Sequence, residues 1–254
     1  KYRITVNRAT NYVAVYSRDG SGAYSIPIIE FSCSTGKNNG TPLATTKISY
    51  RDKFHLMNGG VYSQNAVRFN QGCMFHQSPC RSKRKDTLIT AYYNKLGEQA
   101  SSGCVRLTAA DSEWIYNNCA NGTVVEVIDN PDDYGPFGKP MVPKIPDGHP
   151  SANWDPTDPD PNNPWISERP VVKLVANSTD GATLSLPSGS SYDALYNSLG
   201  LFTPQGEAYT AGNYAMDIYG AYNLNSPGNY TIYVRGHDLS TTLRGDLTVT
   251  LIVN

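Results

Sequence analysis

The sequence predicts a mostly β protein of two domains joined by a proline-rich linker. Short runs that alternate apolar and polar residues recur along most of the 254 residues, separated by turn residues such as those at 19–22. Nine of the 17 prolines fall within residues 139–170, and a chain of this length suits two domains of ordinary size. We therefore expect a first domain over residues 1–138, a linker over 139–170 and a second β domain over 171–254.

Strands dominate the first domain, and one short helix is predicted in it. Thr108 can cap this helix, Asp111 fills its third position, and Gly122 ends the turn that follows. Because the helix begins soon after Cys104, we expect it to hold the segment around this cysteine rigidly against a sheet. The expected strands are residues 2–6, 12–17, 23–31, 46–50, 61–69 and 72–76.

The linker and the second domain differ sharply in composition. Proline cannot donate a backbone hydrogen bond, so residues 139–170 are expected to form an extended, semi-rigid spacer. Trp154 and Trp165 interrupt this spacer, and we expect them to pin it to a domain face rather than to stack on a ligand. The second domain is expected to be a small β-sandwich of strands 171–175, 183–186, 214–219, 228–235 and 247–253.

Composition and charge exclude several classes of function. The net charge is −1 and no basic stripe alternates with aromatic residues, which argues against a nucleic-acid partner. The sequence contains no run of 18 apolar residues, which is about the length that a membrane-spanning helix needs. The four histidines are scattered and no Cys-x-x-Cys pair occurs, so we expect neither a metal nor another cofactor. Positive charge gathers in residues 1–138, with a net charge of +4.

Residues 101–106, Ser-Ser-Gly-Cys-Val-Arg, carry the strongest chemical signal. Cysteine is a strong nucleophile, but it needs a base or a positive field to ionise near pH 7, and His76 lies upstream as a candidate base. Gly103 has no Cβ, which allows an oxyanion to approach the N–H groups of residues 102–104. An isolated Gly-Cys pair is more often a buried core cysteine, so the motif needs supporting context.

That context is a resemblance to a known family. Residues 74–76, Met-Phe-His, followed after 24 residues by Ser101 to Leu107, resemble the signature of the L,D-transpeptidase (YkuD) family of peptidoglycan enzymes. Residues 31–36 with Thr41-Pro42, and residues 121–125, resemble further parts of that family in the same order. Two features depart from the family pattern. Ser102 stands where a histidine is frequent, and the long gap implies an inserted loop over the site.

The resemblance implies an L,D-transpeptidase-type β-sandwich or barrel with a short helix, and a cysteine acyltransferase. Cys104 would form a thioester, and His76 would be the base, oriented by a main-chain carbonyl just after it. The N–H groups of Ser102, Gly103 and Cys104 would bind the oxyanion. With an ordinary histidine as base, the pH profile should have a limb near neutrality. Substrate contacts are expected from Arg106, Ser101 and Gln77, although an ion pair of Arg106 with Asp111 is an equal alternative.

The implied substrates are peptidoglycan stem peptides, with carbapenems as inhibitors. We expect a monomer that is secreted or associated with the cell wall of a bacterium, and a signal or anchor upstream of residue 1. Residues 227–234 and 247–253 resemble bacterial immunoglobulin-like repeats, which would make the second domain a spacer or adhesion module. Two rival functions remain open. The same site could act as an L,D-carboxypeptidase, or the chain could be an inactive surface binding protein.

Two further expectations concern the loop and the cysteines. The basic residues of the 77–100 loop could steer an anionic substrate or could simply be a solvated surface; they are Arg81, Lys83, Arg84 and Lys85. Five cysteines fit one reactive thiol and up to two disulfides, with three possible pairings of Cys33, Cys73, Cys80 and Cys119. We favour a bond between Cys73 and Cys80, and a fully reduced set remains possible.

Overall fold

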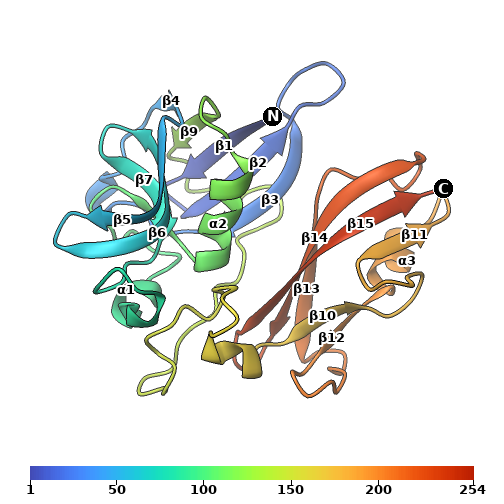
Figure 1. The fold of residues 1–254 in the computed structure, drawn as a ribbon. Coiled ribbons are helices and arrows are strands. Elements are labelled where there is room, and N and C mark those ends of the chain that lie inside the picture. Colours follow the sequence, from blue (N-terminus) through green and yellow to red (C-terminus); the bar gives the residue numbers. More distant parts are fainter. The chain divides into compact units, whose positions relative to one another are not determined.

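The computed structural model describes all residues, 1–254, and the chain divides into two compact units, Lys1–Trp165 and Ile166–Asn254. The predicted mostly β architecture is confirmed (Figure 1). No helix is long and apolar enough to cross a membrane.

One sheet of the first unit has five strands in the order β3-β2-β1-β9-β4. Strands β1 and β2 form an antiparallel hairpin, while β1 and β9 run parallel, with Ile4 opposite Val125. Buried and partly exposed side chains alternate along most of β1 and along β9, whereas four consecutive side chains of β2 are buried, so that both faces of β2 are covered. The strands are β1 (Tyr2–Asn7), β2 (Tyr12–Ser17), β3 (Ile26–Ser32), β4 (Thr45–Lys47) and β9 (Val124–Ile128).

The second sheet carries the functional residues, in the order β5-β6-β7-β8. Strands β5 and β6 form a long hairpin that turns at Gly59 and Gly60, both with positive φ angles that glycine adopts without strain. Only the start of β5 was expected, because most of its side chains are polar and partly exposed. The strands are β5 (Tyr50–Met57), β6 (Val61–Asn70), β7 (Cys73–Gln77) and β8 (Val105–Leu107).

The helix α2 (Ala109–Asn118) packs between the two sheets, directly after β8. As predicted, Thr108 caps it, and its side chain accepts a hydrogen bond from the Asp111 N–H at 3.2 Å. Trp114 of this helix contacts the rings of Tyr2 and Phe31 in the first sheet. Three short helical turns complete the connections in this region: η1 (Lys37–Asn39), η2 (Lys85–Thr87) and α1 (Thr90–Tyr93).

The proline-rich segment differs from the extended spacer that we expected. Residues up to Trp165 belong to the first unit, and Asp155, Asp158 and Trp165 are all at most 1% exposed. Trp165, in the short helix η3 (Pro164–Ser167), stacks on the ring of His149. Its indole N–H donates to the main-chain carbonyl of Ser151 at 2.9 Å. Trp165 therefore anchors the segment by packing.

The second unit has its own apolar core between a four-stranded sheet, β11-β15-β14-β13, and the pair β10-β12. Strand β11 runs parallel to β15, and the other pairings are antiparallel. The short strand β12 and the helix α3 were not expected from the sequence, and the immunoglobulin-like assignment stays a prediction. The elements are β10 (Val171–Leu174), β11 (Thr183–Leu186), α3 (Tyr192–Tyr196), β12 (Leu199–Phe202), β13 (Tyr214–Tyr219), β14 (Gly228–Asp238) and β15 (Arg244–Val253).

Candidate active site

Two neighbouring parallel strands bring the candidate nucleophile and base together. Strand β7 pairs with β8 in a register that sets His76 opposite Arg106. Because side chains alternate between the two faces of a sheet, His76 and Arg106 share a face, and Cys104, two residues before Arg106, follows the same alternation. All three line one pocket of about 450 Å³. Three residues that the sequence analysis singled out for the site therefore lie in one pocket, and their roles stay a prediction.

His76 is 2% exposed, and its orientation is set by a main-chain oxygen. Its Nδ1–H donates to the carbonyl of Gln77 at 2.6 Å, which is the type of partner that we expected. This bond leaves Nε2 as the nitrogen that can accept a proton. Burial lowers the pKa of His76 to about 4, and the nearby Arg106 acts in the same direction. The imidazole is therefore neutral at pH 7.

Cys104 is partly exposed to the pocket, and its sulfur lies 3.6 Å from the carbonyl oxygen of Gly72. Burial raises the pKa of the Cys104 thiol, although the Met74 N–H and Arg106 act in the opposite direction. The resting pair is thus a neutral thiol and a neutral imidazole in the same pocket. Such a pair forms its thiolate only as the proton moves to the base during attack.

The turn before Cys104 is held by the side chain of Ser101. Its hydroxyl donates to the Cys104 carbonyl at 2.6 Å and accepts from the Gly103 N–H at 3.0 Å. The Gly103 N–H is therefore already used within the turn, which corrects the expectation that it binds the oxyanion. The N–H groups of Ser102 and Cys104 remain the candidate donors. Ser101 is buried, so it shapes the turn although it also borders the pocket.

Gly103 is required at its position by both backbone conformation and space. Its φ is +146°, and a Cβ there would lie 3.0 Å from the Gly40 carbonyl oxygen. The Thr41 hydroxyl donates to the Gly103 carbonyl at 2.8 Å and accepts from the Gly36 N–H at 2.8 Å. The Thr-Gly and Thr-Pro segments recognised in the sequence thus brace the nucleophile turn.

The side chains that line the pocket carry positive charge. Arg106 forms no ion pair with Asp111; it packs on the ring of Tyr92 at 4.5 Å and donates to the Ala100 carbonyl. Arg68, which the sequence analysis did not single out, also lines the pocket. The lining includes these two guanidinium groups and neither Asp nor Glu. Such a pocket favours a substrate that carries carboxylates.

The wall opposite the nucleophile turn differs from the one that we expected. Of the 77–100 loop, only Pro79 lines the pocket, whereas the hairpin of β5 and β6 contributes several residues that include His55. In the basic run of the loop, Arg84 pairs with Asp86, and Lys85 pairs with two aspartates of the proline-rich segment. The sequence offered no clear signal for this hairpin, because most side chains of β5 are polar and partly exposed.

The expectations for Gln77 and for the disulfides also require correction. Gln77 is fully buried and absent from the pocket lining, so a direct contact of its side chain with substrate does not fit its position. All five cysteines are free, and the expected bond between Cys73 and Cys80 is wrong. Cys73 lines the pocket close to Gly103, whereas Cys80 is buried beyond the pocket lining.

Comparison with known proteins shows to which family the chain belongs. A family model described as the L,D-transpeptidase catalytic domain (YkuD) matches residues 1–127, which is half of the chain. The chain belongs to the L,D-transpeptidase (YkuD) family. It is also 30% identical over 118 residues to YciB of Bacillus subtilis (strain 168), which is named as a candidate L,D-transpeptidase. That match covers 44% of this chain and 59% of YciB, so the chain spans less than two thirds of this relative.

This YkuD family member is also similar to solved structures of L,D-transpeptidases, three of which follow. The enzyme from Mycobacterium smegmatis is 19% identical with a TM-score of 0.40, covering 50% of this chain and 58% of that one. The enzyme from Stackebrandtia nassauensis is 22% identical with a TM-score of 0.37, covering 52% and 57%. LdtMt1, solved in complex with imipenem, is 15% identical with a TM-score of 0.40, covering 50% and 58%.

Proposed function

We propose that this chain is an L,D-transpeptidase that crosslinks peptidoglycan stem peptides through a thioester on Cys104. His76 Nε2 takes the thiol proton as the sulfur attacks the carbonyl carbon of the third stem residue. The N–H groups of Ser102 and Cys104 stabilise the oxyanion. The intermediate then collapses, the bond to the terminal D-amino acid breaks, and its amine leaves with the proton from His76.

The second half of the reaction releases the acyl group to another stem. An amine of a neighbouring stem attacks the thioester carbonyl and forms the new amide bond. His76 accepts a proton from this amine and returns a proton to the sulfur of Cys104 as the thioester breaks. The thiol and the neutral imidazole are thereby restored.

The observation that carries this proposal is the bond from His76 Nδ1–H to the Gln77 carbonyl, at 2.6 Å, in a pocket shared with Cys104. It fixes a buried, neutral imidazole with its second nitrogen available as a base. An inactive binding protein would need no such arrangement, so the geometry favours an enzyme over that rival. The guanidinium groups of Arg68 and Arg106 suit the carboxylates of stem peptides.

The setting of the enzyme is part of the proposal. A peptidoglycan substrate places the protein outside the cytoplasm, secreted or bound to the cell wall, where it acts as a monomer. A carbapenem would acylate Cys104 in place of the stem peptide. The second unit, Ile166–Asn254, would serve as an immunoglobulin-like spacer or adhesion module.

Muropeptide analysis tests the proposed reaction. Sacculi with tetrapeptide stems are mixed with the full chain, digested to muropeptides and resolved by mass. New crosslinked dimers support a transpeptidase, trimmed tripeptides alone indicate a carboxypeptidase, and an unchanged profile contradicts both. Cys104→Ala is the matched control, because it removes the sulfur and little else, and it should leave the profile unchanged.

A further inference from the structure

The proline-rich segment forms a fixed substructure, which we name the strap and define as residues 151–165. The Asn163 side-chain amide donates to the main-chain carbonyls of Asp155 and Asp158, at 2.9 and 2.8 Å. The indole of Trp165 donates to the Ser151 carbonyl and is almost completely buried. These internal bonds replace the backbone hydrogen bonds that prolines cannot make.

One end of the strap caps the helix that follows the nucleophile. The Asp155 carboxylate accepts from the Ala109 N–H at 2.8 Å, and the Thr157 hydroxyl accepts from the Ala110 N–H at 3.1 Å. A carboxylate at a helix N-terminus satisfies free N–H groups and interacts favourably with the helix dipole. Because α2 begins five residues after Cys104, this contact anchors the strap close to the nucleophile segment.

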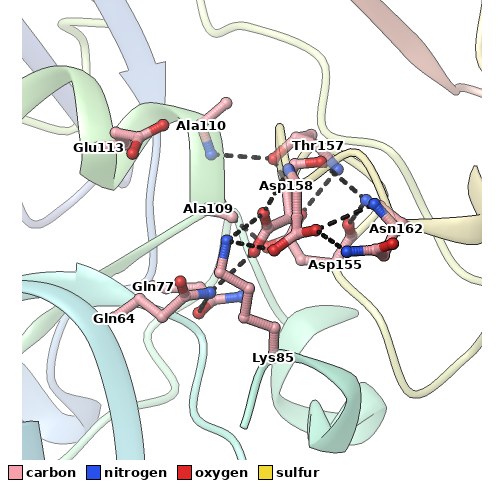
Figure 2. Close-up of polar contacts among 12 residues, drawn as sticks. Gln64, Gln77, Lys85, Ala109, Ala110, Glu113, Asp155, Thr157, Asp158 and Asn162 are labelled. Atoms are coloured by element: carbon pink, nitrogen blue, oxygen red, sulfur yellow. Dashed lines mark hydrogen bonds and ion pairs between the residues drawn. The ribbon is translucent and has the colours of Figure 1, made fainter. Parts of the chain in front are cut away.

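The strap also contacts β6, the strand next to the one that carries the base. Asp158 accepts from the side-chain amide of Gln64 at 2.8 Å, and the same amide donates to the side-chain oxygen of Gln77, also at 2.8 Å (Figure 2). Gln64, Gln77 and Asp158 are each at most 4% exposed. Lys85 holds the other carboxylate oxygen of Asp158 at 3.1 Å.

This chain of contacts ends at the catalytic imidazole. Gln77 is the residue whose main-chain carbonyl accepts from His76 Nδ1–H. Its side chain is held by Gln64, and Gln64 is held in turn by Asp158 of the strap. Buried hydrogen bonds of this kind are costly to leave unmade, so they restrict how the Gln77 peptide can rotate. A fixed peptide keeps its carbonyl directed at Nδ1.

We propose that Gln64 and Asp158 are positioning residues for His76, and that they act through Gln77. The chemical consequence rests on the proposed function, because it needs His76 to be the base. The positioning itself concerns only which nitrogen of His76 carries the proton. With the Gln77 carbonyl in place, the proton stays on Nδ1 and Nε2 remains an acceptor.

Gln64→Met tests this proposal, because it keeps the length of the side chain and removes both of its hydrogen bonds. The protein is labelled with ¹⁵N-histidine, and the tautomer of His76 is read from long-range ¹H–¹⁵N spectra at pH 7. Acylation by a carbapenem is followed on the same samples. We expect the wild type to hold the proton on Nδ1 alone, and the variant to show both tautomers. Its maximal acylation rate should fall roughly tenfold, with little change in the half-saturating concentration.

Thr157→Val is the matched control within the strap. It removes the bonds of the hydroxyl to the Ala110 N–H and to the Asp155 carboxylate but leaves the contact of Asp158 with Gln64 intact, so the His76 tautomer should remain that of the wild type. Asp158→Asn replaces a charge-assisted acceptor by a weaker neutral one and should shift the tautomers and the rate in the same direction as Gln64→Met, by a smaller factor. If Gln64→Met does not fold, the comparison of Asp158→Asn with Thr157→Val decides the question.

A single Nδ1–H tautomer and a wild-type acylation rate in Gln64→Met, or in Asp158→Asn when the former does not fold, overturn the proposal. An equal shift of the tautomers in Thr157→Val also overturns it, since loosening of the strap would then be the cause. Failure of the proposed function has a different signature. In that case the wild type shows the Nδ1–H tautomer and Gln64→Met loses it, but no sample is acylated.

Discussion

The buried state of His76 makes a specific prediction about how acylation depends on pH. Burial lowers the pKa of His76 from 6.5 to about 4. This shift corresponds to a free-energy cost of about 3 kcal/mol for protonating the imidazole in the folded site. The imidazole must be neutral to accept the thiol proton, so the acid limb of the acylation rate should lie near pH 4. The sequence alone had placed this limb near neutrality. At pH 5.5 a base with a pKa of about 4 is roughly 97% neutral, whereas one at 6.5 is about 10% neutral.

The second-order rate of acylation by a carbapenem should therefore change less than about twofold between pH 7.5 and 5.5. The rate is obtained from intact protein mass against time between pH 3.5 and 8, with circular dichroism as a check on folding. His55→Asn serves as the matched control, because His55 is the second histidine in the pocket lining. A roughly tenfold fall between pH 7.5 and 5.5, in both the wild type and His55→Asn, would refute the account of His76.

The remaining predictions concern the pocket walls and the stability of the fold. Thr41→Val removes two buried hydrogen bonds that brace Gly36 and Gly103, so the free energy of unfolding in urea should fall by about 2 kcal/mol, while Thr41→Ser should keep most of it. Arg68→Gln should raise the half-saturating concentration of a carboxylate substrate roughly tenfold, and Arg81→Gln, in the loop that gives the pocket only Pro79, should leave it unchanged. The depressed pKa of His76 favours the folded state above pH 6.5, and this contribution should be lost as the pH falls through 4. Asp155 acts in the opposite direction, because burial raises its pKa to about 6. Ionisation of Asp155 therefore lowers the stability of the folded state as the pH rises from 3.8 through 6. Urea titrations of His76→Gln and Asp155→Asn across pH 4 to 7 should separate the two contributions.

Local signals in the sequence were sufficient for the elements that depend on local physics. The cap at Thr108, the strands β1 and β2 and the motif around Cys104 were all read from neighbouring residues, and the structure contains the cap and both strands. The register of β7 against β8 then brings His76 and Arg106 onto one face. A short motif thus specifies the centre of the site, because pairing of two strands is enough to assemble it.

The parts that could not be predicted depend on contacts between distant segments. Proline and aspartate dominate the strap, and this composition is typical of a solvated spacer, yet Asp155 is buried because the Ala109 N–H at the start of α2, 46 residues away in the sequence, donates to its carboxylate. The Gly103 N–H was assigned to the oxyanion for a related reason. The Ser101 hydroxyl takes up this N–H, and only the three-dimensional turn shows that this donor is already engaged.

The central claim is that Cys104 is the nucleophile, and the most direct test is to locate the acyl adduct. The protein is incubated with a carbapenem, its intact mass is measured, and the modified peptide is identified after digestion. Cys73→Ala is the matched control, because Cys73 is the other thiol of the pocket. We predict one adduct on Cys104 in the wild type and in Cys73→Ala, and none in Cys104→Ala. An adduct that persists in Cys104→Ala, or that maps to Cys73, would contradict the assignment.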